Sequence, residues 1–186
     1  MSDTVLIVIA MQRDYFAGGS APLPDMERAL ERAARLIAMF RTNAVPVIHV
    51  RHLEHDPAVG FLLEGTPGAD IDPRVAPQGE EVLIAKHYPN AFRDTNLAKL
   101  LHVQGAKELF FCGATSNRCI DSTVRVAFDM GYRCTVIEDA CAAADLEFAG
   151  KAIPALQVHR VFMTALACAC GEVVDLKTFS ARLPEI

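Results

Sequence analysis

Apolar runs alternate with segments of helical period along the whole chain. Continuous, largely β-branched apolar runs, typical of strands buried on both faces, occupy residues 5–9, 45–50, 82–85, 107–112, 132–137 and 172–174. Apolar residues at helical spacing predict helices over residues 26–40, 95–103, 119–130 and 152–170. This alternation predicts an α/β fold with a doubly wound, Rossmann-like and mostly parallel six-stranded sheet, helices on both faces and strand order 3-2-1-4-5-6.

One long segment, residues 51–80, interrupts this alternation. It is irregular and rich in proline and glycine, and a loop of this length within a compact domain is usually functional. We therefore expect it to cover a pocket. No repeat or linker divides the chain, so residues 1–186 are expected to form a single domain.

Composition and charge narrow the class of partner. Hydrophobic residues make up 52% of the chain and charged residues 22%, as in a globular protein with a sizeable core. The net charge is −5 and no basic patch stands out, which argues against nucleic acid or a membrane as the partner. The six cysteines mostly lie in apolar runs and no signal peptide is recognisable, so we expect free thiols in a reducing, cytoplasmic compartment.

The candidate nucleophile is Cys119, which lies where a buried strand gives way to a helix. A helix N-terminus presents unpaired N–H groups and the positive end of the helix dipole. Such surroundings lower the pKa of a thiol and favour the reactive thiolate. The alternative is that Cys119 is a small buried hydrophobe, as most cysteines are.

Ligands of an open parallel sheet bind beyond the carboxyl ends of its strands. Ala10 follows the first predicted strand, Lys86 ends the third, and residues 113–119 follow the fourth. A buried lysine beside Cys119 would favour the thiolate or stabilise an oxyanion. The alternative is a solvated lysine at a strand end.

Three motifs occur at these strand ends: Val-Ile-Ala-Met-Gln-Arg-Asp-Tyr-Phe at residues 8–16, Lys-His-Tyr-Pro-Asn-Ala-Phe at 86–92 and Gly-Ala-Thr-Ser-Asn-Arg-Cys-Ile-Asp-Ser-Thr at 113–123. In this order they resemble the motifs of the isochorismatase-like cysteine hydrolases, which include nicotinamidases, N-carbamoylsarcosine amidohydrolases and ureide hydrolases. Asp139, Ala140 and His159 also fit the family pattern. The resemblance extends from residue 5 to about residue 175, nearly the whole chain.

The resemblance implies a role for each matching residue. Cys119 would be the nucleophile and Lys86 the lysine of a catalytic triad. The backbone N–H groups of Thr115 and Cys119 would form the oxyanion hole, next to a cis peptide between Ala114 and Thr115. The residues expected to contact substrate are Tyr15, Phe16, Arg51, His52, Phe61, Tyr88, Phe92 and Ala114.

Position 10 departs from the family pattern, which has the triad aspartate there. The methyl group of Ala10 cannot take a proton from the thiol or give one to a leaving amine. Asp14 is near in sequence, but four positions further on it need not point into the site. The chain is then either an engineered inactive variant or a natural relative that has lost hydrolysis, and the intact remaining motifs favour the engineered variant.

Neither a metal nor any other cofactor is expected. Nicotinamidases of this family bind a metal through an Asp-x-His pair after the second strand, and this pair is missing here; His52 and His55 could bind zinc only in principle. The expected partners are therefore a small-molecule substrate and, because the relatives are usually oligomers, further copies of the chain.

A cysteine nucleophile favours cleavage of a C–N bond in a small amide or ureide. The alternatives are a natural non-catalytic small-molecule-binding relative, an isochorismatase-type hydrolase, and a thiol redox protein in which Cys112 is the near partner of Cys119.

Overall fold

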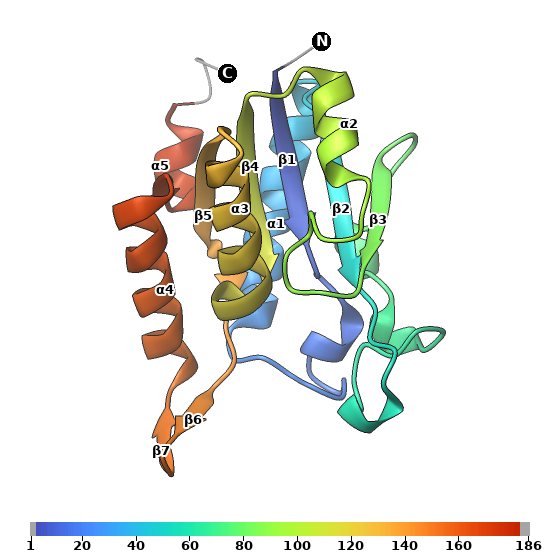
Figure 1. Cartoon of the computed structure of the whole chain (residues 1–186), viewed down its shortest axis with the longest axis vertical. Helices are drawn as coiled ribbons and strands as arrows, with labels where there is room; N and C mark the ends of the chain where they lie inside the picture. Colours follow the sequence, from blue (N-terminus) through green and yellow to red (C-terminus); the bar gives the residue numbers. More distant parts are fainter. Residues whose placement is uncertain (1–2, 183–186) are drawn as a thin grey trace.

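The computed structural model describes residues 3–182, so the first two and last four residues of the predicted 1–186 domain lie outside it. Six parallel strands form one sheet in the order β3-β2-β1-β4-β5-β8 (Figure 1). The predicted strand order is confirmed, with β8 as the sixth strand of this sheet. The strands are β1 (Thr4–Ile9), β2 (Val47–His52), β3 (Val82–Lys86), β4 (Glu108–Ala114), β5 (Arg133–Ala142) and β8 (Glu172–Val174).

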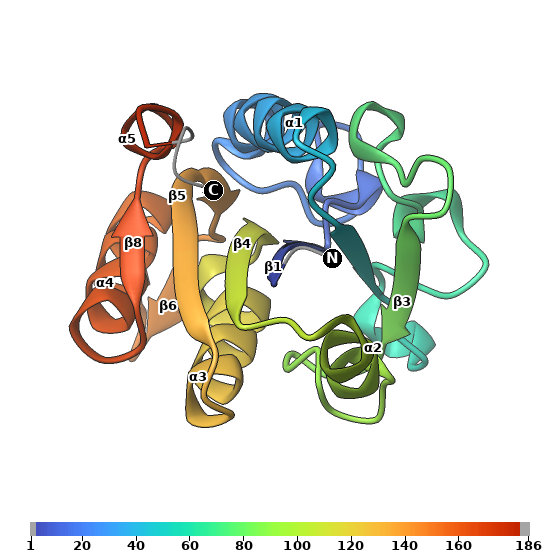
Figure 2. The same ribbon diagram turned by 90° about the horizontal axis from the view of Figure 1, so that it is seen from above.

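Helices cover both faces of the sheet, as predicted. In Figure 2, α1 (Met26–Thr42) and α5 (Leu176–Ser180) lie on one face. The other face carries α2 (Leu97–Gln104), α3 (Asp121–Asp129) and α4 (Ala155–Ala169). Because all six strands are parallel, their carboxyl ends point to the same edge of the sheet.

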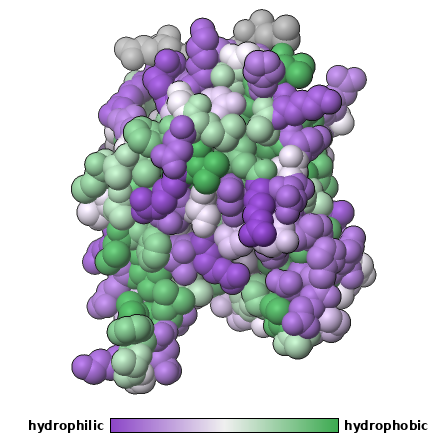
Figure 3. All heavy atoms as spheres, in the orientation of Figure 1, coloured by the Kyte–Doolittle hydropathy of each residue, from purple (hydrophilic) through white to green (hydrophobic). Residues whose placement is uncertain are grey.

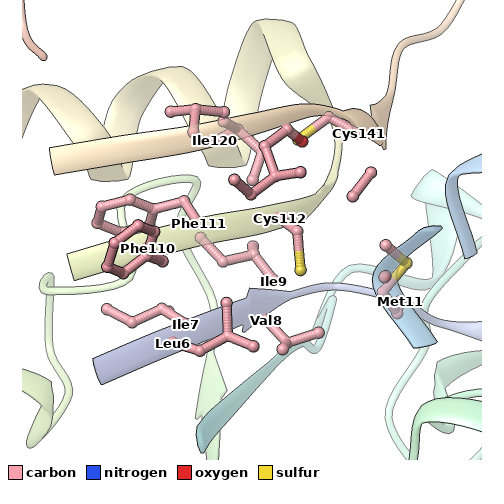
Figure 4. Close-up of a cluster of buried hydrophobic side chains, with 14 of the residues drawn as sticks. Leu6, Ile7, Val8, Ile9, Met11, Phe110, Phe111, Cys112, Ile120 and Cys141 are labelled. Carbon is pink, nitrogen blue, oxygen red and sulfur yellow. The ribbon is translucent and has the colours of Figure 1, made fainter. Parts of the chain in front are cut away.

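The core is centred on β1, the strand between β2 and β4. Every residue of β1 is buried, which explains why its sequence is apolar without alternation. Figure 4 shows its side chains packed with those of β4, among them Phe110, Phe111 and Cys112.

The segment between β5 and α4 differs from the prediction. The strand β5 continues to Ala142 rather than ending at Ile137, and α4 begins at Ala155 rather than Ala152. Between them lies an antiparallel hairpin of β6 (Leu146–Phe148) and β7 (Lys151–Ile153). Its turn places Ala149 and Gly150 at positive φ, and alanine there hides the usual turn signal.

Asp14 ties the long loop of residues 51–80 to the segment after β1. One carboxylate oxygen accepts from the backbone N–H of Ser20 at 3.1 Å and the other from that of Leu62 at 2.6 Å. A Cβ on Gly68 would come within 2.1 Å of the same carboxylate, so glycine is required there. Asp14 therefore organises the loops, as expected for a residue that does not serve as the catalytic base.

Some large apolar side chains remain exposed on α4 and on the β6–β7 hairpin, the lower-left lobe in Figure 3. The side chains of Phe148 and Val161 are 75% and 66% exposed. No helix within residues 3–182 is long and apolar enough to cross a membrane.

Gly113 allows β4 to approach β1 closely at the edge where the strands end. Its φ is +132°, and an added Cβ would lie 1.9 Å from the carbonyl oxygen of Ile9. Both the backbone conformation and the close approach exclude a side chain.

We therefore expect Gly113→Ala to lower the free energy of unfolding by about 3 kcal/mol, because strain and overpacking add. Gly131→Ala is the matched control: Gly131 also has positive φ, but a Cβ there meets no atom within 4 Å. That control should cost only about 1–2 kcal/mol. Urea unfolding of both variants measures the difference, and equal losses would contradict the packing argument.

Candidate active site

Cys119 lies in a helical turn that follows the central strand β4. The strand ends at Ala114, the peptide between Ala114 and Thr115 is cis, and residues Ser116–Ile120 form a π-helical turn that leads into α3. The carbonyl of Thr115 accepts from the N–H groups of Arg118 and Ile120 at 3.1 and 3.2 Å. Cys119 is only 5% exposed, so its thiol is almost surrounded by protein.

Lys86 ends β3 and is fully buried. Its Nζ lies 3.1 Å from the Sγ of Cys119, 3.0 Å from the Nδ1 of His52 and 3.0 Å from the carbonyl oxygen of Tyr88. An ammonium group has three N–H donors, and three acceptors surround this one. The sequence prediction that Lys86 and Cys119 meet is thus realised in the structure.

The local electrostatics favour a neutral imidazole at His52. Burial, and then the charge of Lys86, lower the pKa of His52 to about 4. Burial also lowers the pKa of Lys86, while Cys119 acts in the opposite direction. Burial and the nearby Cys119 raise the pKa of Tyr15, so its phenol stays neutral.

Ala10 lies where β1, β2 and β4 end together. The preceding residue, Ile9, pairs with Val50 of β2 and with Gly113 of β4, and the N–H of Ala10 donates to the carbonyl of Val50 at 2.7 Å. Ala10 is buried and has φ of +50°, a conformation that aspartate and asparagine tolerate better than alanine. Its methyl group offers neither a donor nor an acceptor.

Two of the predicted substrate contacts, Tyr15 and Tyr88, lie beside Cys119 and Lys86. Tyr15 is near enough for the charge of Cys119 to act on it, and its ring lies 6.3 Å from that of Phe61. The ring of Tyr88 is covered by the guanidinium of Arg93 at 3.5 Å, while its carbonyl faces Lys86. Phe92 is half-buried against the core.

Two predicted contacts lie in other hollows. Phe16 lines a hollow of about 460 Å³ with Asp14 and Arg74, and the Arg74 guanidinium lies 5.5 Å from the Phe16 ring centre. Arg51 lines a separate hollow of about 380 Å³. Side chains alternate along a strand, so Arg51 points away from the side on which its neighbour His52 meets Lys86. Neither hollow includes Cys119 among its lining residues, and contact of Phe16 and Arg51 with substrate stays a prediction.

Gln12 is a functional candidate whose role the sequence analysis missed. Its buried side-chain amide accepts from the N–H of His52 and donates to the carbonyls of His52 and Ala69, each at 2.7 Å. This fixes the backbone that carries His52 and joins it to the long loop. A buried amide directly after a buried strand was the signal that could have identified it.

A second polar chain holds the start of the turn that carries Cys119. Ser116 donates to the carbonyl of Ala142 at 3.1 Å, and its Oγ lies 2.8 Å from the Nδ1 of His159. The other ring nitrogen of His159 lies 3.1 Å from a carboxylate oxygen of Glu138. This chain borders a cavity of about 280 Å³ that does not include Cys119.

The residues present do not fit the metal site of nicotinamidases. Within residues 3–182, no three His, Cys, Asp or Glu side chains lie together as a metal site requires. The Nδ1 of His52 faces the Lys86 ammonium, which would repel a cation. His55 is exposed, stacks on His87 at 3.9 Å between ring centres and lies 3.7 Å from Glu64.

The thiol redox alternative finds no support in the cysteine geometry. All six cysteines are free, and Cys112 is fully buried. Burial, and then the neighbouring Cys141, raise the pKa of Cys112 well above its usual value, so it is a poor resolving thiol.

Comparisons with known proteins agree with these motifs. The family description "Isochorismatase domain" matches residues 4–168. The uncharacterized isochorismatase family protein YddQ of Bacillus subtilis (strain 168) is 44% identical over 97% of this chain and 98% of its own length. The maleamate amidohydrolase of Pseudomonas putida is 32% identical over 72% of this chain and 70% of its own length. The crystal structure of an isochorismatase hydrolase relative from Oleispira antarctica superposes with a TM-score of 0.92, at 44% identity and 96% coverage of both chains.

We expect Cys119 to be the most reactive buried thiol. Iodoacetamide at neutral pH, followed by peptide mapping, should label it before Cys112, Cys134 and Cys141; burial raises the pKa of the latter two to about 12. Cys168 is exposed, so the experiment uses a Cys168→Ser background.

In that background Lys86→Met should slow labelling of Cys119 about tenfold or more, because a charge-assisted hydrogen bond to the thiolate is lost. Lys107→Met is the control, because Lys107 is an exposed lysine on the opposite edge of the sheet, before β4. Equal labelling rates for all the cysteines would count against the site.

Metal independence is a further prediction. Protein purified without a chelator should contain well under one equivalent of zinc, iron or manganese by elemental analysis. The reason is that the Nδ1 of His52, which a metal would need, already accepts a hydrogen bond from Lys86. A stoichiometric metal that is lost in His52→Leu or His55→Leu would overturn this expectation and point toward a nicotinamidase-type site.

Proposed function

The chain belongs to the isochorismatase family of hydrolases, and we propose that it is a cysteine-dependent amidohydrolase acting on a C–N bond of a small amide or ureide. The observation that carries the proposal is the buried contact of 3.1 Å between Lys86 and Cys119. A thiolate nucleophile is suited to acyl transfer from an amide. The similarity to a maleamate amidohydrolase, itself named for an amide substrate, supports the same bond type.

The proposed reaction proceeds through an acyl-enzyme on Cys119. The thiolate attacks the carbonyl carbon, and the backbone N–H groups of Thr115 and Cys119 stabilise the oxyanion. As the C–N bond breaks, the Lys86 ammonium gives a proton to the leaving amine. Water then attacks the thioester and gives a proton back to the Lys86 amine, so that the acid is released and the ion pair is restored.

The unpartnered polar atoms near the nucleophile support a polar substrate. Within the described part of the chain, the Oγ1 of Thr115 and the Oδ1 of Asn117 are buried without a hydrogen-bond partner. Buried polar groups are normally satisfied, so these atoms are suited to an amide or ureide. No cofactor is needed for this chemistry. The identity of the substrate and self-association remain predictions.

Ala10 is proposed to hold turnover near the uncatalysed baseline. The family places the triad aspartate at this position, and without it Lys86 is, among residues 3–182, the only group in hydrogen-bond contact with the thiol that can carry protons. A non-catalytic binding protein that keeps the pocket is the second candidate, and Ala10 is the observation in its favour. An isochorismatase-type reaction is less suited, since members that hydrolyse isochorismate lack the nucleophilic cysteine.

Restoring the carboxylate tests this proposal. Ala10→Asp should raise amide hydrolysis about 10²–10⁴-fold, because a positioned proton-transfer group is worth that much. Ammonia release from a panel of small primary amides and ureides is the readout. Ala10→Asn is the matched control, because it has the same shape and tolerates positive φ but cannot transfer a proton.

In the double variants Ala10→Asp/Cys119→Ser and Ala10→Asp/Lys86→Ala, ammonia release should fall back to the rate of the unmodified chain. The effects of residues that act together in one reaction are not additive, so the added carboxylate gives no gain without Cys119 or Lys86. An Ala10→Asp protein that is folded, binds a small amide and releases no ammonia would favour the binding-protein candidate instead.

A further inference from the structure

One contact of Lys86 is not used by the reaction described above. Besides Cys119 and the carbonyl of Tyr88, its Nζ lies 3.0 Å from the Nδ1 of His52. Three acceptors for three N–H donors describe an ammonium group held in one orientation.

His52 must be the acceptor in this contact. A lysine ammonium only donates, so the Nδ1 of His52 carries no proton and its Nε2 carries one. The Nε2 lies 3.6 Å from a carboxylate oxygen of Glu54, which suits this tautomer. Burial and the charge of Lys86 hold the pKa of His52 near 4, so the imidazole is neutral at neutral pH.

The position of His52 is fixed from both sides of its backbone. Gln12 accepts from its N–H and donates to its carbonyl, each at 2.7 Å. In the sheet, His52 of β2 is the direct partner of Lys86 of β3. Paired residues of neighbouring strands point their side chains to the same face of the sheet. The imidazole of His52 therefore lies against the ammonium of Lys86.

We propose that His52 is the positioning residue that holds Lys86 protonated against Cys119 in a site that has no carboxylate at position 10. The step it favours moves one proton from the Sγ of Cys119 to the Nζ of Lys86. His52 neither gains nor loses a proton, and the ion pair has no net charge. This role rests on the proposed function, in which Cys119 is the nucleophile, and it assigns to His52 the orientation of the lysine that contacts it.

The other charged or titratable groups around this pair do not supply the same function. Glu54 faces the far nitrogen of His52. Arg118 is positive and acts against protonation of both His52 and Lys86. Tyr15 is kept neutral because burial raises its pKa.

The test is the rate of iodoacetamide labelling of Cys119 as a function of pH, in the Cys168→Ser background. His52→Leu removes the acceptor while keeping an apolar side chain of similar size, so water does not replace the imidazole. We expect labelling at neutral pH to slow about tenfold or more and the midpoint of the profile to move to higher pH, because a hydrogen bond to a charged group is lost.

His52→Asn should largely restore the wild-type profile, since its side-chain oxygen can take the place of Nδ1. His55→Leu, which removes an exposed histidine three residues away, should leave the profile unchanged. Thermal unfolding of each variant checks that it is folded.

A His52→Leu profile that coincides with the wild type would overturn the proposal. Equal changes in the leucine and asparagine variants would also contradict it, because they would indicate packing rather than hydrogen-bond acceptance. Labelling requires no substrate. The expected shift in labelling, found together with no hydrolysis of any amide by any variant, would support the role of His52 and contradict the proposed hydrolase function.

Discussion

The arrangement of the site depends on one interaction, the buried contact between the Lys86 ammonium and the Cys119 sulfur. A lysine that is fully buried, as Lys86 is, is destabilised unless each of its donors finds an acceptor. The three acceptors come from three segments: β2 through His52, the turn after β3 through Tyr88, and the turn after β4 through Cys119. Satisfying the ammonium therefore requires these segments to meet at one edge of the sheet.

The fold meets this requirement through parallel strand ends and a small number of buried polar side chains. Gly113 lets β4 approach β1, and the segment from Gln12 to Asp14 attaches the long loop. Ser116, His159 and Glu138 hold the other side of the turn. These contacts together fix the segments that carry Cys119, His52 and Lys86.

Sequence pattern was sufficient for the sheet because apolar runs alternating with helical segments predict a doubly wound fold, whose usual strand order is 3-2-1-4-5-6. The same pattern identified Lys86 and Cys119, since both lie at strand ends. It could not reveal the β6–β7 hairpin, where Ala149 takes a turn position usually held by asparagine or glycine. Nor could it show that the ring of Phe16, in the loop after β1, lies beside the guanidinium of Arg74. The role of Gln12 depends on contacts across 40 and 57 positions, and its place after β1 could suggest a buried amide but not these partners.

The central claim is that the buried contact with Lys86 makes Cys119 the nucleophile without help from a carboxylate. Ultraviolet thiolate absorbance, taken as the difference between the protein and its Cys119→Ser variant across a pH series, compares this thiol with and without Lys86. The account predicts that Lys86→Met moves the appearance of the thiolate signal to higher pH, because a positive charge beside the sulfur is lost. A signal that appears over the same pH range with and without Lys86 would contradict the claim.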